Sequence, residues 1–463
     1  MDRNNKMGTE KITRLLLQFS LPAIVGMLVN ALYNIVDRIF IGNSAELGTL
    51  GLAGLTISFP IMMIMMALAV LFGIGGATLF SIRLGEGKPE EAERVLGLTS
   101  LLLILSALTL TVVGNIYLES LLKAFGASEA VLPHAMEYMR IILLGAVFQG
   151  ISMGGNNFIR ADGSPKIAML TMFLGAGFNI LFDPLLIYVF GWGMAGAAIA
   201  TVGGWVLTSI WVGFYFYGSK SKSAAKFKPE NARFDPALAL RITLTGVPAF
   251  TMQVSNSVLN VVLNKSLAFY GGDIAVSGMG IINAIQTIMI MPLIGINQGT
   301  SPIVGFNFGA RQYDRVKEAI KWAIVGASTV TVAGYVLIKA VPELLITMFN
   351  REPDLIAFAS RGLSIWFYFL PVVGFQVVGA NYFQAVGKVR PAILLTLTRR
   401  VLILVPAIII LAQRYGTDGI LAASPLADIL AAAITGIWLS LELRQLGKEG
   451  QPGFGLEGSG QKA

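Results

Sequence analysis

The chain has no cysteine and a single histidine, His134, among its 463 residues. It therefore forms no disulfide and offers no thiolate ligand, and one imidazole is too few for a histidine metal cage. Charged residues are also scarce, at 13% of the chain against 55% hydrophobic residues. This composition is typical of a chain embedded in a lipid bilayer and excludes an ordinary water-soluble globular domain.

Apolar segments of about 20 residues recur from one end of the chain to the other, and this is the length with which an α-helix crosses a bilayer. The first segment is too long for a signal peptide, contains Pro22 and lacks a small-residue cleavage site, so we expect no cleavable signal. The sequence predicts twelve membrane-spanning helices, at 13–40, 52–81, 95–117, 138–160, 166–190, 194–217, 239–269, 275–306, 318–340, 361–386, 391–412 and 418–442.

The net charge of +8 comes from Lys and Arg residues that gather at alternate ends of these segments. We expect the chain to lie in a plasma or inner membrane. By the positive-inside rule, this distribution of charge places both termini in the cytoplasm. The charge is therefore a topology signal and does not indicate nucleic-acid binding. The residues assigned to the cytoplasmic side include Lys388, Arg390, Arg399 and Arg400.

The two halves of the chain resemble each other. GIGGAT at 73–78 corresponds to GINQGT at 295–300, and NNFIRADGSPKIAML at 156–170 corresponds to ANYFQAVGKVRPAILL at 380–395. Matches in the same order predict a parallel repeat of six plus six helices. The predicted organisation is an N-terminal lobe at 1–217, a cytoplasmic linker at 218–241, a C-terminal lobe at 242–445 and a disordered tail at 446–463.

Two carboxylates lie inside apolar segments of the first half. Asp37 shares one helical stripe with Asn30 and Tyr33, and Asp183 lies one turn after Asn179 in the fifth segment. In the repeat, Asp37 aligns with Leu263 and Asp183 with Pro406, so the second half lacks both acids. A charge inside a bilayer is costly and marks a functional candidate. We expect the two acids to meet and, with Asn179 and Thr201, to bind a proton or a sodium ion.

Simpler explanations exist for each acid. Asp37 would be structural if it lay at the membrane surface beside Arg38, and Asp183 would be structural if it capped a helix break at Pro184. Asp428 is a third acid in an apolar segment, and the sequence leaves its role open between a satisfied polar residue and a site in the second half. An intramembrane diaspartyl protease would also use two buried acids, but the sequence disfavours it because the chain lacks the Gly-x-Gly-Asp type of signature at Asp183.

Pro22 and Pro248 occupy the same place in the two repeats, and we interpret them as bend points for a conformational change. A substrate cavity is expected where flexible methionines and polar side chains line the interior, although lipid-facing or packing methionines are the common alternative. Its predicted lining is Asn30, Asn34, Met62, Met66, Gln149, Asn256, Asn260, Asn283, Gln286 and Met289.

These motifs resemble the multidrug and toxin extrusion (MATE) family. The likeness rests on LPAIVGMLVNALYNIVDRIFIG at 21–42, on FNILFDPLLIYVFGWGMAGAAIAT at 178–201 and on the parallel repeat, and it covers about residues 10–445. The corresponding seventh and tenth segments carry Gln253, Asn256 and Gln376 and no carboxylate, so the chain is similar to the DinF-like and MepA-like branch and departs from NorM-type members.

The resemblance implies an all-α polytopic membrane protein whose two six-helix lobes export organic cations in exchange for protons or sodium ions. It maps the family's cation site onto Asp37, Asn179, Asp183 and Thr201, with Tyr33 one turn before Asp37. The expected partners are an amphipathic small molecule and membrane lipids, with no enzyme activity, no cofactor beyond the coupling ion, and a monomeric state. A flippase for a lipid-linked or polysaccharide precursor is the alternative function on the same fold.

Overall fold

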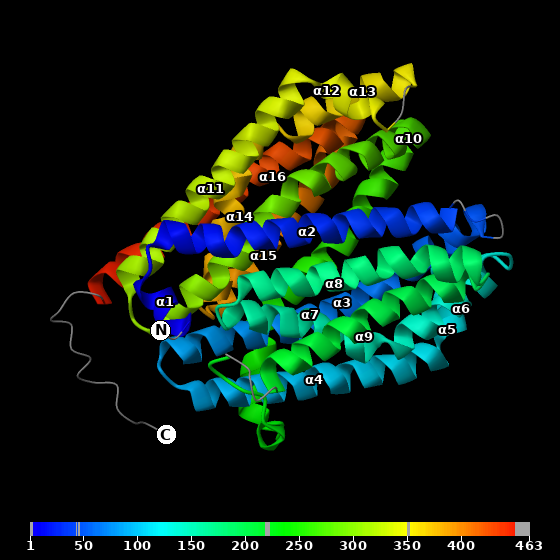
Figure 1. Cartoon of the computed structure of the whole chain (residues 1–463). Helices are drawn as coiled ribbons and strands as arrows, with labels where there is room; N and C mark the ends of the chain where they lie inside the picture. Colours follow the sequence, from blue (N-terminus) through cyan, green and yellow to red (C-terminus); the bar gives the residue numbers. More distant parts are fainter. Residues whose placement is uncertain (1–2, 43, 45–46, 218–222, 350–351, 450–463) are drawn as a thin grey trace.

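The computed structural model describes residues 3–42, 44, 47–217, 223–349 and 352–449, and the regular elements of these residues are helices. Figure 1 shows their arrangement. In chain order they are α1 (Arg3–Thr9), α2 (Ile12–Gly42), α3 (Gly48–Gly85), α4 (Pro89–Ile116), α5 (Leu118–Ala124), α6 (Leu132–Leu144), α7 (Ala146–Ala161), α8 (Pro165–Pro184), η1 (Leu185–Val189), α9 (Gly193–Tyr217), η2 (Pro229–Asn231), α10 (Pro236–Gly309), α11 (Tyr313–Ala340), α12 (Pro342–Thr347), α13 (Pro353–Trp366), α14 (Leu370–Ala385), α15 (Val389–Leu397), η3 (Thr398–Leu404) and α16 (Val405–Glu449).

The described helices provide the twelve spans that the sequence predicts. Eight stretches are long and apolar enough to cross a membrane. Two of them, α10 and the stretch from α15 to α16, each hold two spans, because Gly272 (φ 62°) and Gly416 (φ 58°) break the helix in the left-handed region that glycine tolerates. Two bent pairs, α6 with α7 (55°) and α13 with α14 (53°), add one span each.

Two predicted boundaries differ from the structure. Helix α10 begins at Pro236, inside the predicted linker, because Asp235 caps it by accepting hydrogen bonds from the backbone N–H groups of Ala237 and Leu238. Helix α16 continues to Glu449, past the predicted start of the tail, because Leu446 is buried in the hydrophobic core. The predicted disordered stretch at 450–463 lies outside the described residues.

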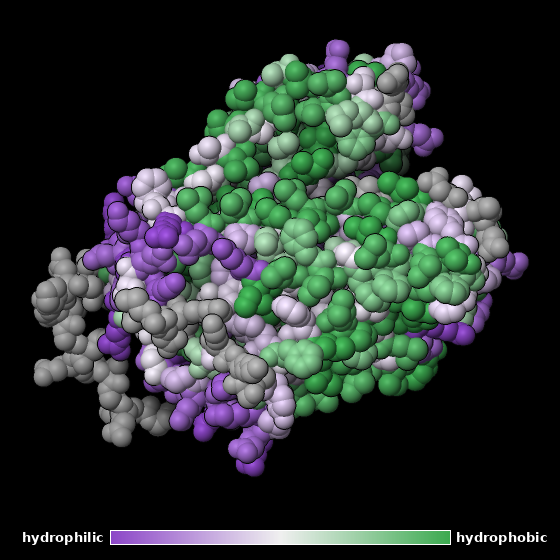
Figure 2. Space-filling model, in the orientation of Figure 1, coloured by the Kyte–Doolittle hydropathy of each residue, from purple (hydrophilic) through white to green (hydrophobic). Residues whose placement is uncertain are grey.

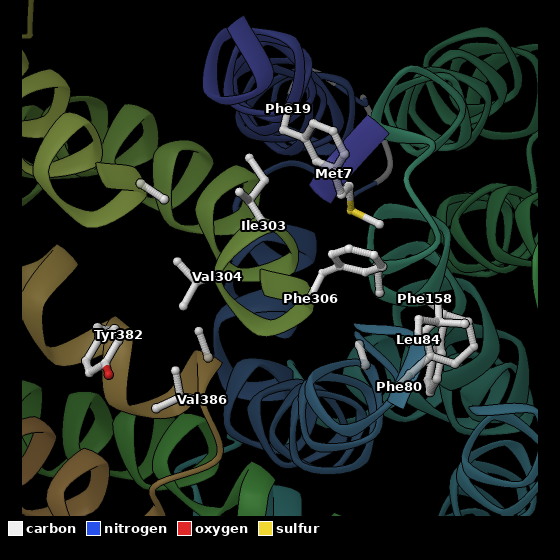
Figure 3. Packing of buried hydrophobic residues seen from close by; sticks show 14 of the residues in the cluster. Met7, Phe19, Phe80, Leu84, Phe158, Ile303, Val304, Phe306, Tyr382 and Val386 are labelled. Atoms are coloured by element: carbon white, nitrogen blue, oxygen red, sulfur yellow. The ribbon is translucent and has the colours of Figure 1, made fainter. Parts of the chain in front are cut away.

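The helices form two groups that meet at one end of the molecule and diverge at the other (Figure 1). The buried hydrophobic residues follow this division. One cluster is confined to residues 41–198 and a second to residues 263–427, whereas a third joins residues of both halves. We call the end that contains this shared cluster the closed end, and Figure 3 shows part of it, with Phe80 and Leu84 on one side and Ile303 and Phe306 on the other.

Glycines allow α3 and α10 to cross at backbone contact in the closed end. A Cβ atom on Gly246 would lie 1.7 Å from the carbonyl oxygen of Leu71, and one on Gly75 would lie 2.2 Å from that of Ile242. The same relation recurs at Gly309, where a Cβ would lie 2.1 Å from the carbonyl oxygen of Ile82. Small residues are what let membrane helices pack this closely.

The N-terminal segment also connects the lobes at the closed end. Arg315, at the start of α11, donates from Nη2 to the carbonyl oxygens of Met7 (2.9 Å) and Glu10 (2.7 Å). Asn307 donates to Met7 as well, at 3.0 Å, and accepts from Nε of Arg315 at 2.9 Å. Helix α1 is therefore hydrogen-bonded to the second lobe while α2, which follows it, belongs to the first.

The surface agrees with a membrane location. In Figure 2 a broad hydrophobic surface separates hydrophilic residues at the closed end from others at the opposite end. Large apolar side chains are exposed among the described residues, for example Leu181 (71%), Val189 (73%) and Phe214 (71%). Contiguous exposed apolar surface of this kind is unusual in a soluble monomer and suits contact with lipid chains.

The described part of the linker is attached to the first lobe by buried acids. Asp162 accepts hydrogen bonds from the backbone N–H of Ala224 (3.1 Å) and the hydroxyl of Tyr215 (2.6 Å). Glu93 accepts from the backbone N–H of Lys226 (3.1 Å) and pairs with the ammonium group of Lys228 at 2.7 Å. Because that ammonium group donates to Glu93 and is attracted by it, the pKa of Lys228 is raised.

This attachment gives the first prediction. Asp162→Ala removes the hydrogen bond to Ala224 of the linker and the one to Tyr215 near the end of α9, so trypsin is expected to cleave after Lys226 or Arg233 about ten times faster than in the unaltered protein. Glu230→Ala, which removes an exposed carboxylate from the same linker, is the matched control. Equal cleavage rates in the two variants would show that Asp162 does not hold the linker.

Candidate functional site

Three neighbouring helices of the first lobe bring the predicted ion-binding residues together. Helix α2 packs against α8, and α8 packs against α9, so Asp37, Asp183 and Thr201 face a common interior. Asp183 is fully buried, Asn179 is 2% exposed and Thr201 is 8% exposed. The bilayer-length helices thus place two carboxyl groups, one amide and one hydroxyl away from lipid.

The contacts inside this group are specific. The amide nitrogen Nδ2 of Asn179 donates to Oδ1 of Asp183 at 3.3 Å and to Oγ1 of Thr201 at 3.2 Å. Asp183 interacts with Asp37 through charge and through a side-chain hydrogen bond. Two ionised carboxylates are both acceptors, so a hydrogen bond between them exists only when one of them holds a proton. The arrangement is therefore able to store a proton.

The amide oxygen of Asn179 is a further available acceptor. It is buried and receives no hydrogen bond from any residue in the described part of the chain. Carboxylate, amide and hydroxyl oxygens are the ligands that hard cations such as sodium prefer. Neither here nor elsewhere among the described residues is a cluster of three or more His, Cys, Asp or Glu side chains placed to hold a metal ion.

Tyr138, on α6, is a member of this group that the sequence did not indicate. Its side chain is 2% exposed, it interacts electrostatically with Asp37, Tyr33 and Asp183, and its hydroxyl is hydrogen-bonded to Thr201. Tyr138 lies in an unremarkable stretch, LPHAMEYMRIILL, in which no other residue belongs to the site. Only the bend between α6 and α7 and the packing against α9 bring it there.

The surroundings of each acid bear on the simpler explanations, while the shared role of the two acids stays a prediction. Asp183 is bonded to Asn179, one turn earlier, and does not cap the π-helix η1 that follows Pro184. Asp37 is partly buried and interacts with Asp183 rather than lying only at a membrane surface. The side chain of Arg38, which that alternative requires, lies outside the described residues.

The remaining predicted residues are distributed between the lobes. Gln149 lines a small pocket in the first lobe, together with Met65 rather than Met62 or Met66. Gln286 and Met289 line a second pocket in the other lobe. Of the other predicted lining residues, Asn30, Asn256 and Asn283 are half-buried and Asn260 is exposed. That all these residues line one substrate cavity stays a prediction. The side chain of Asn34 lies outside the described residues.

Pro22 and Pro248 are both buried inside continuous helices, α2 and α10. Neither helix is interrupted at its proline, and the role of the two residues as bend points stays a prediction. Proline inside a helix removes one backbone hydrogen bond, so these are positions where the helix bends at low cost.

The second lobe holds a buried ion pair that the sequence interpretation did not recognise. Its counterparts of the two acids are apolar, Leu263 and Pro406, as predicted. Arg399 and Arg400, however, were counted with the basic residues of the cytoplasmic side, although both fall within the predicted span 391–412, and the structure corrects this. Both lie in the π-helix η3, where Nε of Arg399 pairs with Asp428 at 2.7 Å and Arg400 donates to the carbonyl oxygen of Met252 at 3.2 Å.

Comparisons with known proteins agree on one family. A family model described as MatE matches residues 22–185 and 248–409. Multidrug export protein MepA of Staphylococcus haemolyticus (strain JCSC1435) is 26% identical over 426 residues, covering 91% of this chain and 92% of that protein. An FAD transporter of Shewanella oneidensis is 26% identical over 428 residues, covering 90% and 92%. The crystal structure of a MATE protein in the bent conformation has a TM-score of 0.91 at 25% identity, covering 97% of this chain and 99% of that chain.

Proposed function

This chain belongs to the MatE family of multidrug efflux transporters, and we propose that it is a secondary active antiporter that exports organic cations in exchange for protons or sodium ions. Its similarity to MepA supports the branch that the sequence indicated. The observation that carries the proposal is the buried contact between Asp37 and Asp183 in the first lobe, which has no carboxylate counterpart at Leu263 and Pro406.

The chemistry of exchange follows from that contact. When the carboxyl pair shares a proton or holds a sodium ion, its negative charge is neutralised and the three helices pack around it. Without the ion, two carboxylates face each other at close range and repel, and a substrate cation in the same lobe relieves the repulsion. Ion and substrate therefore bind antagonistically, which is the requirement for antiport.

Transport then needs a conformational change that the ion biases. The lobes meet at the closed end and diverge at the other, and rocking them about the substrate exposes it to alternate sides. An ion shifts this equilibrium only by its difference in affinity between the two arrangements. Bending of α2 at Pro22, on the same helix as Asp37, is the proposed source of that difference, with Pro248 as its counterpart in the second lobe.

The orientation in the membrane follows from the charges. Basic residues gather at the closed end, including Arg83, Lys88 and Arg315, so we assign this end to the cytoplasm together with both termini, in a plasma or inner membrane. The chain then opens outward in the arrangement shown in Figure 1. A monomer suffices for this mechanism, because both lobes belong to one chain, and no enzymatic step or cofactor is part of it.

An imposed-gradient experiment tests the function. Proteoliposomes that start with the same concentration of rhodamine 123, a permanent cation, inside and outside are expected to build up a gradient of the dye when a pH gradient or a sodium gradient is imposed. Empty liposomes control for leakage of the dye. Transport that proceeds equally well without any ion gradient would contradict antiport, and the gradient that drives transport identifies the coupling ion.

One observation from the structure supports a second function on the same fold, the export of a lipid-linked or polysaccharide precursor. Such precursors carry phosphates, and the spans of this chain contain the arginines Arg160, Arg399 and Arg400. Arg160 is 5% exposed and donates to Gln298 and to Asn157. Flipping of a fluorescent lipid-linked precursor in the same proteoliposomes, in the absence of rhodamine transport, would favour this function.

A further inference from the structure

The pocket of the second lobe is lined by an ion pair and by a hydrogen-bond donor that has no partner among the described residues. It is lined by Gln286, Met289, Trp366, Arg399, Ser424 and Asp428, which come from α10, α13, η3 and α16. Arg399 and Asp428 form a buried ion pair, with 13% and 5% of their side chains exposed. Replacing a buried ion pair with apolar residues often leaves a protein equally stable. Stability alone therefore does not explain why this ion pair lies in a pocket.

Three side chains in or beside this pocket can donate more hydrogen bonds than the described residues accept from them. The indole Nε1 of Trp366 is buried, in a side chain 3% exposed, and has no hydrogen-bond partner among the described residues. Arg399 bonds Asp428 through Nε, and no described residue accepts from its two terminal nitrogens. Arg400 bonds a backbone carbonyl group, and no carboxylate of the described residues forms an ion pair with it. Leaving such a donor unsatisfied is costly unless a ligand completes it.

The local helix geometry explains why both arginines turn inward. Pro406 has no N–H to bond the carbonyl group four residues earlier, and η3 adopts the wider π-helical turn just before it. Two guanidinium groups and one carboxylate then lie together, which leaves one positive charge in excess inside the span. Cations at this depth usually mark a substrate or ion pathway.

We propose that this pocket binds an anionic group of the transported substrate, a carboxylate or phosphate, and so gives the transporter a preference, among aromatic cations, for zwitterions that also carry such a group. The anion accepts hydrogen bonds from the terminal nitrogens of Arg399 and from the indole N–H of Trp366. A guanidinium group can bind a carboxylate through two parallel hydrogen bonds, and the indole adds a third donor. Asp428 is the internal anion that competes with it. Met289 and the face of Trp366 contact the apolar body. The proposal rests on the proposed transport function and adds a substrate class to it.

Two dyes that differ only in the acid group test this site. Rhodamine 110 carries a free carboxylate, and rhodamine 123 is its methyl ester. In binding titrations followed by fluorescence anisotropy, Trp366→Phe and the double variant Arg399→Gln with Asp428→Asn are each expected to weaken binding of rhodamine 110 about tenfold and that of rhodamine 123 less than about twofold. Asp428→Asn alone is expected to tighten rhodamine 110 binding, because it removes the competing anion.

Matched controls are available in the same lobe. Trp322→Phe changes an exposed tryptophan of α11, and the double variant Arg361→Gln with Asp418→Asn neutralises an exposed ion pair that does not line the pocket. Neither is expected to alter the ratio of the two affinities. If the variants of Arg399 and Asp428 do not fold, Trp366→Phe alone tests the anion site. Equal changes for both dyes in Trp366→Phe would overturn the anion site, while rhodamine 123 transport by the unaltered protein would leave the proposed function standing.

Discussion

Asp183→Asn is expected to reduce ion-driven efflux of rhodamine 123 by about 10- to 100-fold in proteoliposomes, with the protein still folded. The amide has nearly the shape of the carboxyl group, so the hydrogen bond from Asn179 and the packing of α8 against α2 are retained. What is lost is the ability to take up and release a proton, or to offer an anionic ligand to sodium. Asp37→Asn is expected to act in the same way, because the two side chains form one site.

Asp314→Asn is the control variant for the loss of one carboxylate. Asp314 is fully exposed and pairs with Lys317 at 3.5 Å near the start of α11, so its loss changes the charge of the protein by the same amount without touching the site. Its efflux rate should equal that of the unaltered protein. Full efflux by both Asp37→Asn and Asp183→Asn would end the coupling mechanism.

Gly246→Ala is the second large effect that we expect. Its new methyl group would lie 1.7 Å from the carbonyl oxygen of Leu71, and this neighbour is backbone that no side-chain rotation can move. The two lobes must separate where α3 crosses α10, at a cost of about 3 kcal/mol or more to the closed end. Efflux should fall to near background, and thermal unfolding in detergent should begin at a lower temperature.

Gly280→Ala is the control for this substitution, because it adds the same methyl group to the same helix at an exposed position with no atom within 4 Å. Since the chain has no cysteine, spin labels introduced at residues 88 and 311 report the separation at the closed end directly. A distance that is longer in Gly246→Ala than in Gly280→Ala is expected. Unchanged distances and rates would show that this crossing is not part of the closed end.

Much of the fold was available from the sequence because the bilayer imposes it. A helix must satisfy its own backbone groups in lipid, so apolar length alone predicted the twelve spans, and the repeat predicted two lobes. The turns at Gly272 and Gly416 fall between predicted spans for the same reason. The closed end was not predictable, because it depends on backbone contacts such as that of Gly246 with Leu71, between helices distant in sequence.

The candidate site was predictable in part for a different reason. Asp37 and Asp183 stand out because a carboxylate in an apolar segment is costly, and their contact followed from the helix pattern. Tyr138 gave no such signal, since a tyrosine in an apolar helix is usually a packing residue. Arg399 and Arg400 were counted with the cytoplasmic basic residues because Lys and Arg usually mark that side, and only the contact with Asp428 and the π-helix show that they lie inside the span.

The most direct test of ion coupling is the affinity for rhodamine 123 in detergent, measured as a function of pH and of sodium concentration without any gradient. If the pair of Asp37 and Asp183 holds the coupling ion, affinity in the unaltered protein falls as protons or sodium ions are added, and this dependence disappears in the double variant Asp37→Asn with Asp183→Asn. An equal dependence in both proteins would contradict the account, because the ion and the drug would then compete somewhere else.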